Sequence, residues 1–284
     1  MTTQTATEPA FDEAAPQASA ISKALASSPR PQRPTALSTS LTFGQRALLK
    51  IRYVPEQLAD VTLFPVMMTL LFTWLFGGAI AGSTQAYIQF LAPGVLVQSV
   101  LMITMYTGVT LRTDIDKGVF DRFRSLPIWR PSALVGMLLG DAVRFTIASI
   151  ITAIVCLGLG WRPAGGFAGV ALGVLLLLVF AFSLGWIWTF LSMILRTPNA
   201  IMGAAMFVLM PLTFGSNIFV DPSTMPGWLQ AWVNVNPVSH LVTSVRGLMN
   251  GVPVGSEVLW TLGWAGALVV VFGSLTMWKY RDPR

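Results

Sequence analysis

The sequence predicts an all-α membrane protein with six transmembrane helices. Hydrophobic residues make up 54% of its 284 residues and charged residues only 11%, whereas ordinary soluble domains are about 25% charged. Apolar stretches of the length that crosses a bilayer, about 20 residues, recur along the chain. Because a backbone in lipid must satisfy its own hydrogen bonds, we expect these stretches to be helices.

The N-terminal part of the chain differs from the rest. Residues 1–40 contain five prolines among Ala, Ser and Thr and show no sustained apolar periodicity, which predicts a disordered cytoplasmic tail. They lack the apolar core of a cleaved signal peptide, so the first span is expected to be the targeting signal. In residues 41–60 three basic residues alternate with apolar ones. This pattern predicts an amphipathic helix on the membrane surface, ended or bent by Pro55.

The apolar stretches place the six spans in order. They fall at about residues 61–81, 87–111, 132–159, 167–195, 199–220 and 258–278. Before the last span, residues 221–257 are also poor in charge, but Pro222, Pro226 and Pro237 divide them into pieces too short to cross a bilayer. We expect short interfacial or re-entrant helices there.

The basic residues predict the orientation. Of the 18 Lys and Arg residues, 15 lie in the termini, in residues 112–132 or at Arg196, whereas only Arg162 and Arg246 fall on the opposite side and Arg144 lies within a span. By the positive-inside rule, both termini of this multi-pass protein are cytoplasmic. The formal charge of +6 is therefore interpreted as a topology signal and not as a nucleic-acid surface.

Residues 112–132, called here the charged loop, interrupt the apolar sequence. Residues 61–111 before them hold no Asp, Glu, Lys or Arg, so the loop must lie in water. Its apolar residues recur with helical spacing at Ile115, Val119, Phe123 and Leu126. This spacing predicts a short amphipathic helix from Asp114 to Leu126, ended by Pro127, that docks on another molecule. The alternative is a loop that only fixes topology.

Two sets of short motifs carry a family resemblance. The first is Asp116-Lys117-Gly118, Asp121-Arg122-Phe123-Arg124 and Leu126-Pro127; the second is Asn236-Pro237 followed by Val245-Arg246-Gly247-Leu248 and Gly251. The first set resembles the cytoplasmic coupling loop of ABC-2 type exporter permeases, in particular those similar to the daunorubicin-resistance membrane subunit, with Asp where Glu is commoner. The second resembles the external motif before the family's last span. Residues 41–284 are thus identified as an ABC-2 type transmembrane domain.

The resemblance implies a permease subunit that exports a hydrophobic or amphiphilic compound, such as a drug, an antibiotic or a lipid, across a prokaryotic cell membrane. It implies two copies of a cytoplasmic ATPase subunit that binds ATP and Mg, and a second copy or homologue of this permease. The implied coupling residues are Asp116, Lys117, Gly118, Val119, Phe120, Arg122, Phe123, Arg124 and Leu126. No Lys follows a Gly in this chain, so no Gly-Lys-Ser/Thr phosphate-binding loop is encoded. We expect no catalytic residue, cofactor or metal site here.

Asp141 and Arg144 are the charged residues of the third predicted span. They stand one helical turn apart and can pair, which lowers the roughly 2.5 to 3.5 kcal/mol that a lone charge costs at membrane depth. They could form a hinge, a substrate-facing polar site or a structural pair. Arg144 could instead reach a carboxylate on another helix.

Other functions stay open at this point. Polysaccharide or glycolipid export is the main alternative within the family. An integral membrane enzyme would need titratable residues clustered at one depth, and a carrier or channel would show paired halves or more intramembrane charge. The only histidine, His240, has no carboxylate near it in sequence and is expected to be a packing residue at the interface. With Cys156 as the only cysteine, no internal disulfide is possible.

Overall fold

The computed structural model describes residues 55–118 and 132–281, together with Thr35, Ser38, Thr42 and Gln45. All regular structure in these residues is helical, which confirms the all-α prediction for this part of the chain. Most of the predicted tail, the amphipathic segment before Pro55 and residues 119–131 lie outside the described residues.

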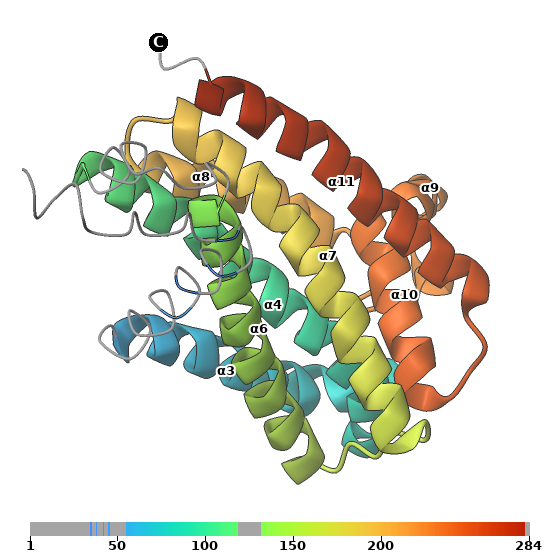
Figure 1. Cartoon of the computed structure of the whole chain (residues 1–284). Coiled ribbons are helices and arrows are strands. Elements are labelled where there is room, and N and C mark those ends of the chain that lie inside the picture. The colour runs from blue at the N-terminus through green and yellow to red at the C-terminus, as the bar shows by residue number, and fades with distance from the viewer. Residues whose placement is uncertain are drawn as a thin grey trace, which may run out of the picture. The chain divides into compact units, whose positions relative to one another are not determined.

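Eight α-helices and one 3-10 turn make up the described part (Figure 1). They are α3 (Pro55–Ala81), α4 (Thr84–Asp116), α6 (Ser132–Gly158), α7 (Gly166–Ile194), α8 (Pro198–Phe214), η1 (Pro222–Thr224), α9 (Gly227–Val235), α10 (Pro237–Asn250) and α11 (Gly255–Arg281). Within the described ranges, α4, α6, α7 and α11 are long and apolar enough to cross a membrane. The helices α3 and α8 coincide with the first and fifth predicted spans, but the count of six spans stays a prediction.

Three helix boundaries differ from the expected ones. Pro55 begins α3, a position that suits proline because the first helical residue needs no N–H. Residues 55–60 therefore belong to α3. The helix α8 ends at Phe214, before the expected end near Val220. At this end the Gly215 N–H donates a hydrogen bond to the Pro211 carbonyl at 2.9 Å. The third difference, at the end of α4, shapes the candidate site and is described with it.

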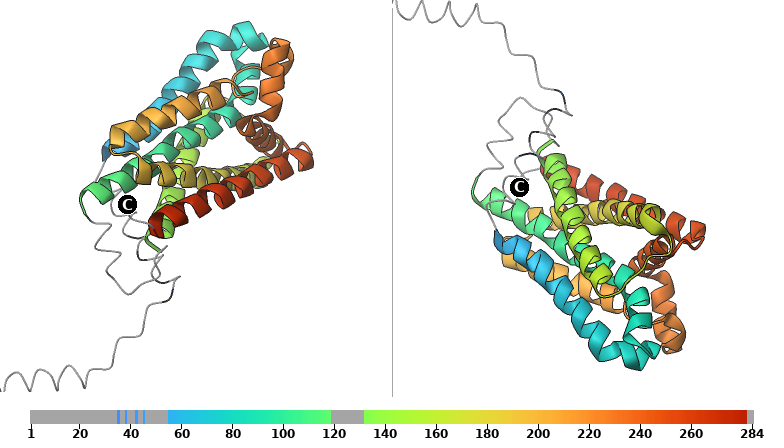
Figure 2. Two further views of the ribbon diagram at one scale, coloured as in Figure 1. Left: turned by 90° about the horizontal axis from the view of Figure 1, so that it is seen from above. Right: turned by 90° about the horizontal axis from the view of Figure 1, so that it is seen from below.

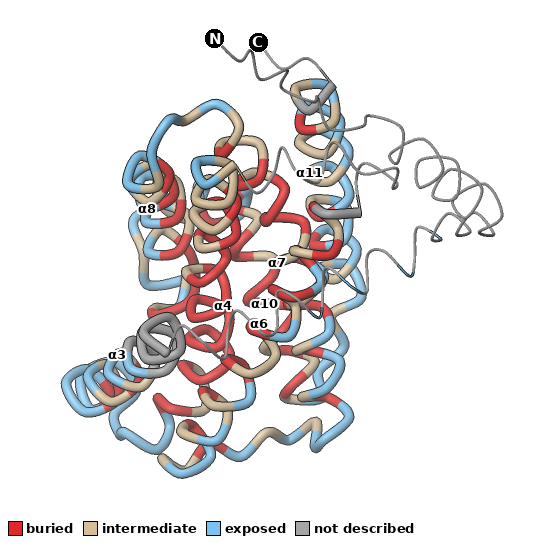
Figure 3. Tube along the Cα trace, turned by 60° about the vertical axis from the view of Figure 1, so that its left-hand side comes forward, coloured by how far each residue is buried: buried red, intermediate tan, exposed pale blue. Residues whose placement is uncertain are grey.

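The helix α4 occupies the centre of the bundle. It packs against α3, α6, α7, α8 and α10. In an apolar stretch of 18 residues of this helix, 89% is buried inside the protein (Figure 3). In the apolar stretch of the same length in α11, only 11% is buried. α4 is thus the core of the fold, whereas α11 lies at its periphery, against α7 and α10.

Glycines allow the central helices to approach closely. A Cβ atom at Gly108 of α4 would lie 2.8 Å from the Trp188 carbonyl oxygen of α7, and one at Gly169 of α7 would lie 2.3 Å from the Leu248 carbonyl oxygen of α10. Small residues at such contacts let helix backbones pack tightly in a membrane. α7 is therefore held between α4 and α10, with α11 beside it (Figure 2).

Candidate functional site

A buried polar cluster joins α6 to α4. Arg144 Nη2 lies 3.1 Å from Asp141 Oδ1 one turn earlier on α6, and the Thr107 hydroxyl of α4 donates a hydrogen bond to Asp141 Oδ2 at 2.6 Å. Asp141 is 3% exposed and Arg144 is 6% exposed. A carboxylate away from water is stabilised by such partners, so α6 is fastened to the central helix at this point.

The same face of α4 continues the polar contacts toward α7. Thr104 stands one turn before Thr107, and its hydroxyl accepts a hydrogen bond from the Trp188 indole N–H at 2.8 Å. Arg144 Nε and Nη1 are buried and make no hydrogen bond to any described residue. Thr104 and Thr107 thus tie α4 to two neighbours. Sequence analysis did not single them out, although two threonines three residues apart beside Gly108 could have indicated a helix contact.

The C-terminal end of α4 departs from the expected structure. The predicted helix from Asp114 to Leu126 does not begin at Asp114, because α4 continues without a break to Asp116. An ion pair between Arg112 and Asp116, four residues apart, accompanies this last turn. Gly118, at φ 65°, then leaves the helix with its N–H bonded to the Ile115 carbonyl at 2.9 Å.

The predicted coupling residues therefore divide into two groups. Asp116, Lys117 and Gly118 form the C-terminal end of α4 and its cap. The others lie outside the described residues: Val119, Phe120, Arg122, Phe123, Arg124 and Leu126. The central helix thus leads directly into the charged loop.

Asn236 of the second motif connects α10 to α8. Its Oδ1 accepts from the Val238 N–H at 2.9 Å and caps α10, while its Nδ2 donates to the carbonyl oxygens of Leu212 and Gly215 at 2.8 and 3.0 Å. Pro237 takes the first helical position, where no N–H is needed. One side chain thus satisfies the start of one helix and the end of another.

Arg246 fixes α10 to the start of α4 and to the chain after α8. Its Nε donates to the Phe90 carbonyl at 3.2 Å and its Nη2 to the Asn217 carbonyl at 2.9 Å. The guanidinium carbon stands 3.8 Å from the centre of the Phe90 ring, which favours a cation. Burial lowers the pKa of Arg246 to about 10, so the side chain stays charged at neutral pH.

Gly247 and Glu257 complete this region. A Cβ atom at Gly247 would lie 2.3 Å from Val254 Cγ1, so a larger residue would displace the turn into α11. Across that turn His240 Nδ1 lies 2.6 Å from Glu257 Oε2, and the His240 ring stacks on Trp260 with centroids 5.8 Å apart. Local sequence gave no sign of the carboxylate beside His240, because the two residues are far apart along the chain.

The described residues contain no group of three or more His, Cys, Asp and Glu side chains that could hold a metal ion. What they contain are polar contacts between helices. Thr107, Asp141 and Arg144 hold α6 to α4, and Asn236 and Arg246 hold the opposite end. Such an arrangement can fix helix positions and transmit their movement.

The chain has clear relatives. Residues 40–250 match the family described as ABC-2 type transporter. The chain is 49% identical over 258 residues to the daunorubicin resistance ABC transporter permease protein DrrB1 of Streptomyces coeruleorubidus, with 91% of each chain covered. It is 23% identical over 185 residues to the probable doxorubicin resistance ABC transporter permease protein DrrC of Mycobacterium tuberculosis, covering 64% of this chain and 65% of that one. To the putative transport permease ycf38 of Cyanophora paradoxa it is 23% identical over 211 residues, covering 71% of each.

Proposed function

We propose that this chain, which belongs to the ABC-2 type transporter family, exports hydrophobic or amphiphilic drugs of the daunorubicin kind. The observation that carries this proposal is the 49% identity, over 91% of both chains, to a daunorubicin resistance permease. It favours drug export over export of a polysaccharide or glycolipid. The chain is the permease subunit.

ATP hydrolysis would belong to a partner. Two copies of a cytoplasmic ATPase subunit, with ATP and Mg, would serve two permease chains, this one and a second copy or homologue. The absence of a Gly-Lys-Ser/Thr sequence in the chain supports a separate ATPase. The matched residues 40–250 include the whole charged loop, where this partner would dock.

The central helix offers a route from that partner to the translocation path. α4 runs from its buried contacts with five helices straight to Asp116 and Lys117 at the loop. A displacement of the loop would therefore move a helix that contacts α3, α6, α7, α8 and α10 together. We assign Asp141 and Arg144 a positioning role in this movement, because their partner Thr107 belongs to α4.

The convergence of basic residues supports the proposed orientation. Arg112 of α4, Arg196 after α7 and Lys279 of α11 line one cavity, although they come from three separate parts of the chain. Positive charge is expected on the cytoplasmic side of a membrane protein. This end of the bundle, together with the charged loop and both termini, would therefore face the cytoplasm.

The test is drug transport with the partner ATPase. Inverted membrane vesicles that contain both proteins should take up daunorubicin when ATP is added. The uptake is measured as a decrease in daunorubicin fluorescence. Asp116→Lys, at the loop, should reduce uptake strongly, whereas Asp221→Lys, an exposed acid in the external segment, should leave it near the wild-type rate. Wild-type vesicles that show no ATP-dependent uptake of daunorubicin or other amphiphilic drugs would contradict the proposal.

A further inference from the structure

A cavity with three basic residues lies where α4, α7 and α11 end on the same side. Its volume is about 420 Å³, and its lining includes Arg112, Arg196 and Lys279 beside the apolar side chains of Phe190, Met193 and Trp278. No acidic side chain is part of this lining. The cavity thus combines a positively charged surface with an apolar one, a combination that matches the junction between a phosphate headgroup and its hydrocarbon chains.

Two of these basic residues, Arg112 and Arg196, keep donors that no described acidic residue takes up. Arg112 pairs with Asp116 of its own helix, yet its Nε is buried without a hydrogen bond to any described residue. Arg196 is exposed, and the described residues include no acidic partner for it. Several cationic donors around one space favour an anion with several oxygen acceptors, such as a phosphate.

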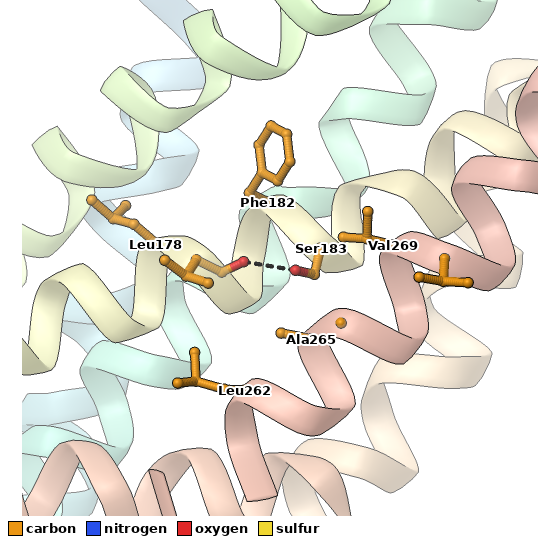
Figure 4. Close-up of a pocket in the computed structure, with 9 residues that line it drawn as sticks. Leu178, Phe182, Ser183, Leu262, Ala265 and Val269 are labelled. Atoms are coloured by element: carbon orange, nitrogen blue, oxygen red, sulfur yellow. Dashed lines mark hydrogen bonds between the residues drawn. The ribbon is translucent and has the colours of Figure 1, made fainter. Parts of the chain in front are cut away.

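A second cavity lies between α7 and α11, two of the three helices that form the first one. It measures about 560 Å³ and is lined mainly by apolar side chains, of which Leu178, Phe182, Leu262, Ala265 and Val269 are labelled in Figure 4. The Ser183 hydroxyl in its wall already donates to the Val179 carbonyl at 2.9 Å. The cavity therefore suits hydrocarbon and offers no polar partner to a headgroup.

The separation of the two cavities matches one lipid leaflet. From Met193 back to Phe182 is eleven residues of α7, which is ~16 Å at about 1.5 Å per residue. Half of the roughly 30 Å hydrocarbon core is about 15 Å. Phe190, which also lines the basic cavity, packs on Phe272 with ring centroids 6.1 Å apart, so the surface that leads from this cavity along α7 and α11 is apolar there. A chain that starts at the basic cavity would reach the second cavity near the bilayer centre.

We propose that the cytoplasmic ends of α4, α7 and α11 bind one anionic glycerophospholipid of the inner leaflet. Its phosphate lies among Arg112, Arg196 and Lys279, and one acyl chain runs along the α7–α11 seam into the apolar cavity. The site goes beyond drug export and depends on the proposed orientation only for the choice of leaflet. Because Arg112 belongs to the last turns of α4, the bound lipid holds this end of α4 against α7 and α11.

The test is lipid binding to the purified full-length chain in neutral detergent, measured by native mass spectrometry. Dioleoyl phosphatidylglycerol should bind with a single tight site, and dioleoyl phosphatidylcholine should not. The double substitution Arg196→Gln/Lys279→Gln should weaken phosphatidylglycerol binding about thirtyfold, since each basic residue near an anionic headgroup contributes about five- to sixfold. Lys117→Gln, which removes a charge at the same end outside the cavity, should leave binding unchanged.

The acyl-chain part has its own matched pair. Gly266 lines the apolar cavity and Gly263 does not, and a Cβ atom at either would meet open space. Gly266→Phe should fill the cavity and weaken phosphatidylglycerol binding about tenfold, equivalent to roughly two methylene groups left unburied. Gly263→Phe should bind as the wild type does.

Three results would overturn the proposal. One is equal binding of phosphatidylglycerol by the wild type and the Arg196→Gln/Lys279→Gln chain. Another is displacement of the lipid by inorganic phosphate at equal concentration, which would indicate a phosphate site without acyl recognition. The third is an equal effect of Gly266→Phe and Gly263→Phe. Co-purification of the ATPase, measured for the same variants after co-expression of the two subunits, separates failure of the lipid site from failure of the exporter assignment.

Discussion

The helices α4 and α11 are both apolar and long enough to cross a membrane, yet they occupy opposite environments. α4 is buried against five neighbours and carries Thr104, Thr107 and Gly108 at its contacts. α11 packs mainly against α7 and α10 and exposes large side chains such as Leu259, Trp260 and Val270. Hydropathy alone does not separate them. What distinguishes the central helix is where its small and hydroxyl-bearing residues lie. Thr104, Thr107 and Gly108 of α4 contact neighbouring helices, which are specific contacts that lipid cannot replace, whereas Gly263 and Gly266 of α11 face open space.

The largest effect is expected from removing one partner of the polar cluster that joins α6 to α4. We expect Asp141→Ala or Arg144→Ala alone to lower stability by about 3 to 5 kcal/mol, because each leaves an uncompensated buried charge. The double substitution should be less harmful than either single one. Folded yield and thermal unfolding in detergent measure the cycle, and additive losses would show that the ion pair of 3.1 Å is not energetically coupled.

Overpacking should give the next largest effect. Gly108→Leu would place atoms against the Trp188 backbone on α7, where a Cβ alone comes within 2.8 Å, and should cost about 1 to 3 kcal/mol or more. Gly263→Leu on α11 meets open space and should change stability by no more than about 0.5 kcal/mol. The two unfolding temperatures, measured side by side, test whether the environments differ. Equal losses at the two positions would remove the distinction between the central and the peripheral helix.

A smaller effect is expected where α10 meets the start of α4. Arg246→Lys keeps the charge but cannot reproduce the paired donors to the Phe90 and Asn217 carbonyls. We expect a loss of about 1 to 3 kcal/mol. Arg162→Lys, on the same side but exposed, should cost less. Thermal unfolding of both variants measures the two losses. An unchanged unfolding temperature for Arg246→Lys would mean that the hydrogen bonds of Arg246 do not fix α10.

Most of the helices could be predicted from the sequence, because each long apolar run in the described part of the chain forms a helix. The helix ends were missed for identifiable reasons. Charged residues after Leu111 were assigned to the loop, although the spacing of Arg112 and Asp116 allows an ion pair along one more turn of helix. The apolar residues after Gly215 suggested a longer fifth span, but the Gly215 cap ends α8.

The candidate site was less predictable than the fold. The pairing of Asp141 with Arg144 follows from local spacing, since both lie on one helix turn. The contact of Thr107 with Asp141, and that of His240 with Glu257, join residues far apart in the chain. Periodicity along one helix says which face is apolar but not which neighbour that face meets. Such contacts depend on the tertiary packing of the helices.

The most direct test of the account is whether the charged loop, at the end of the central helix, holds the ATPase. Co-purification of the two subunits and drug-stimulated ATP hydrolysis in reconstituted membranes should be compared for Phe123→Ala in the loop and Phe207→Ala on the exposed face of α8. We predict that Phe123→Ala weakens attachment by about 2 kcal/mol, as loss of a buried aromatic anchor does, and that Phe207→Ala behaves as the wild type does. Full co-purification and full stimulation with Phe123→Ala, and likewise with Asp116→Lys, would contradict the account and leave the loop as a determinant of topology only.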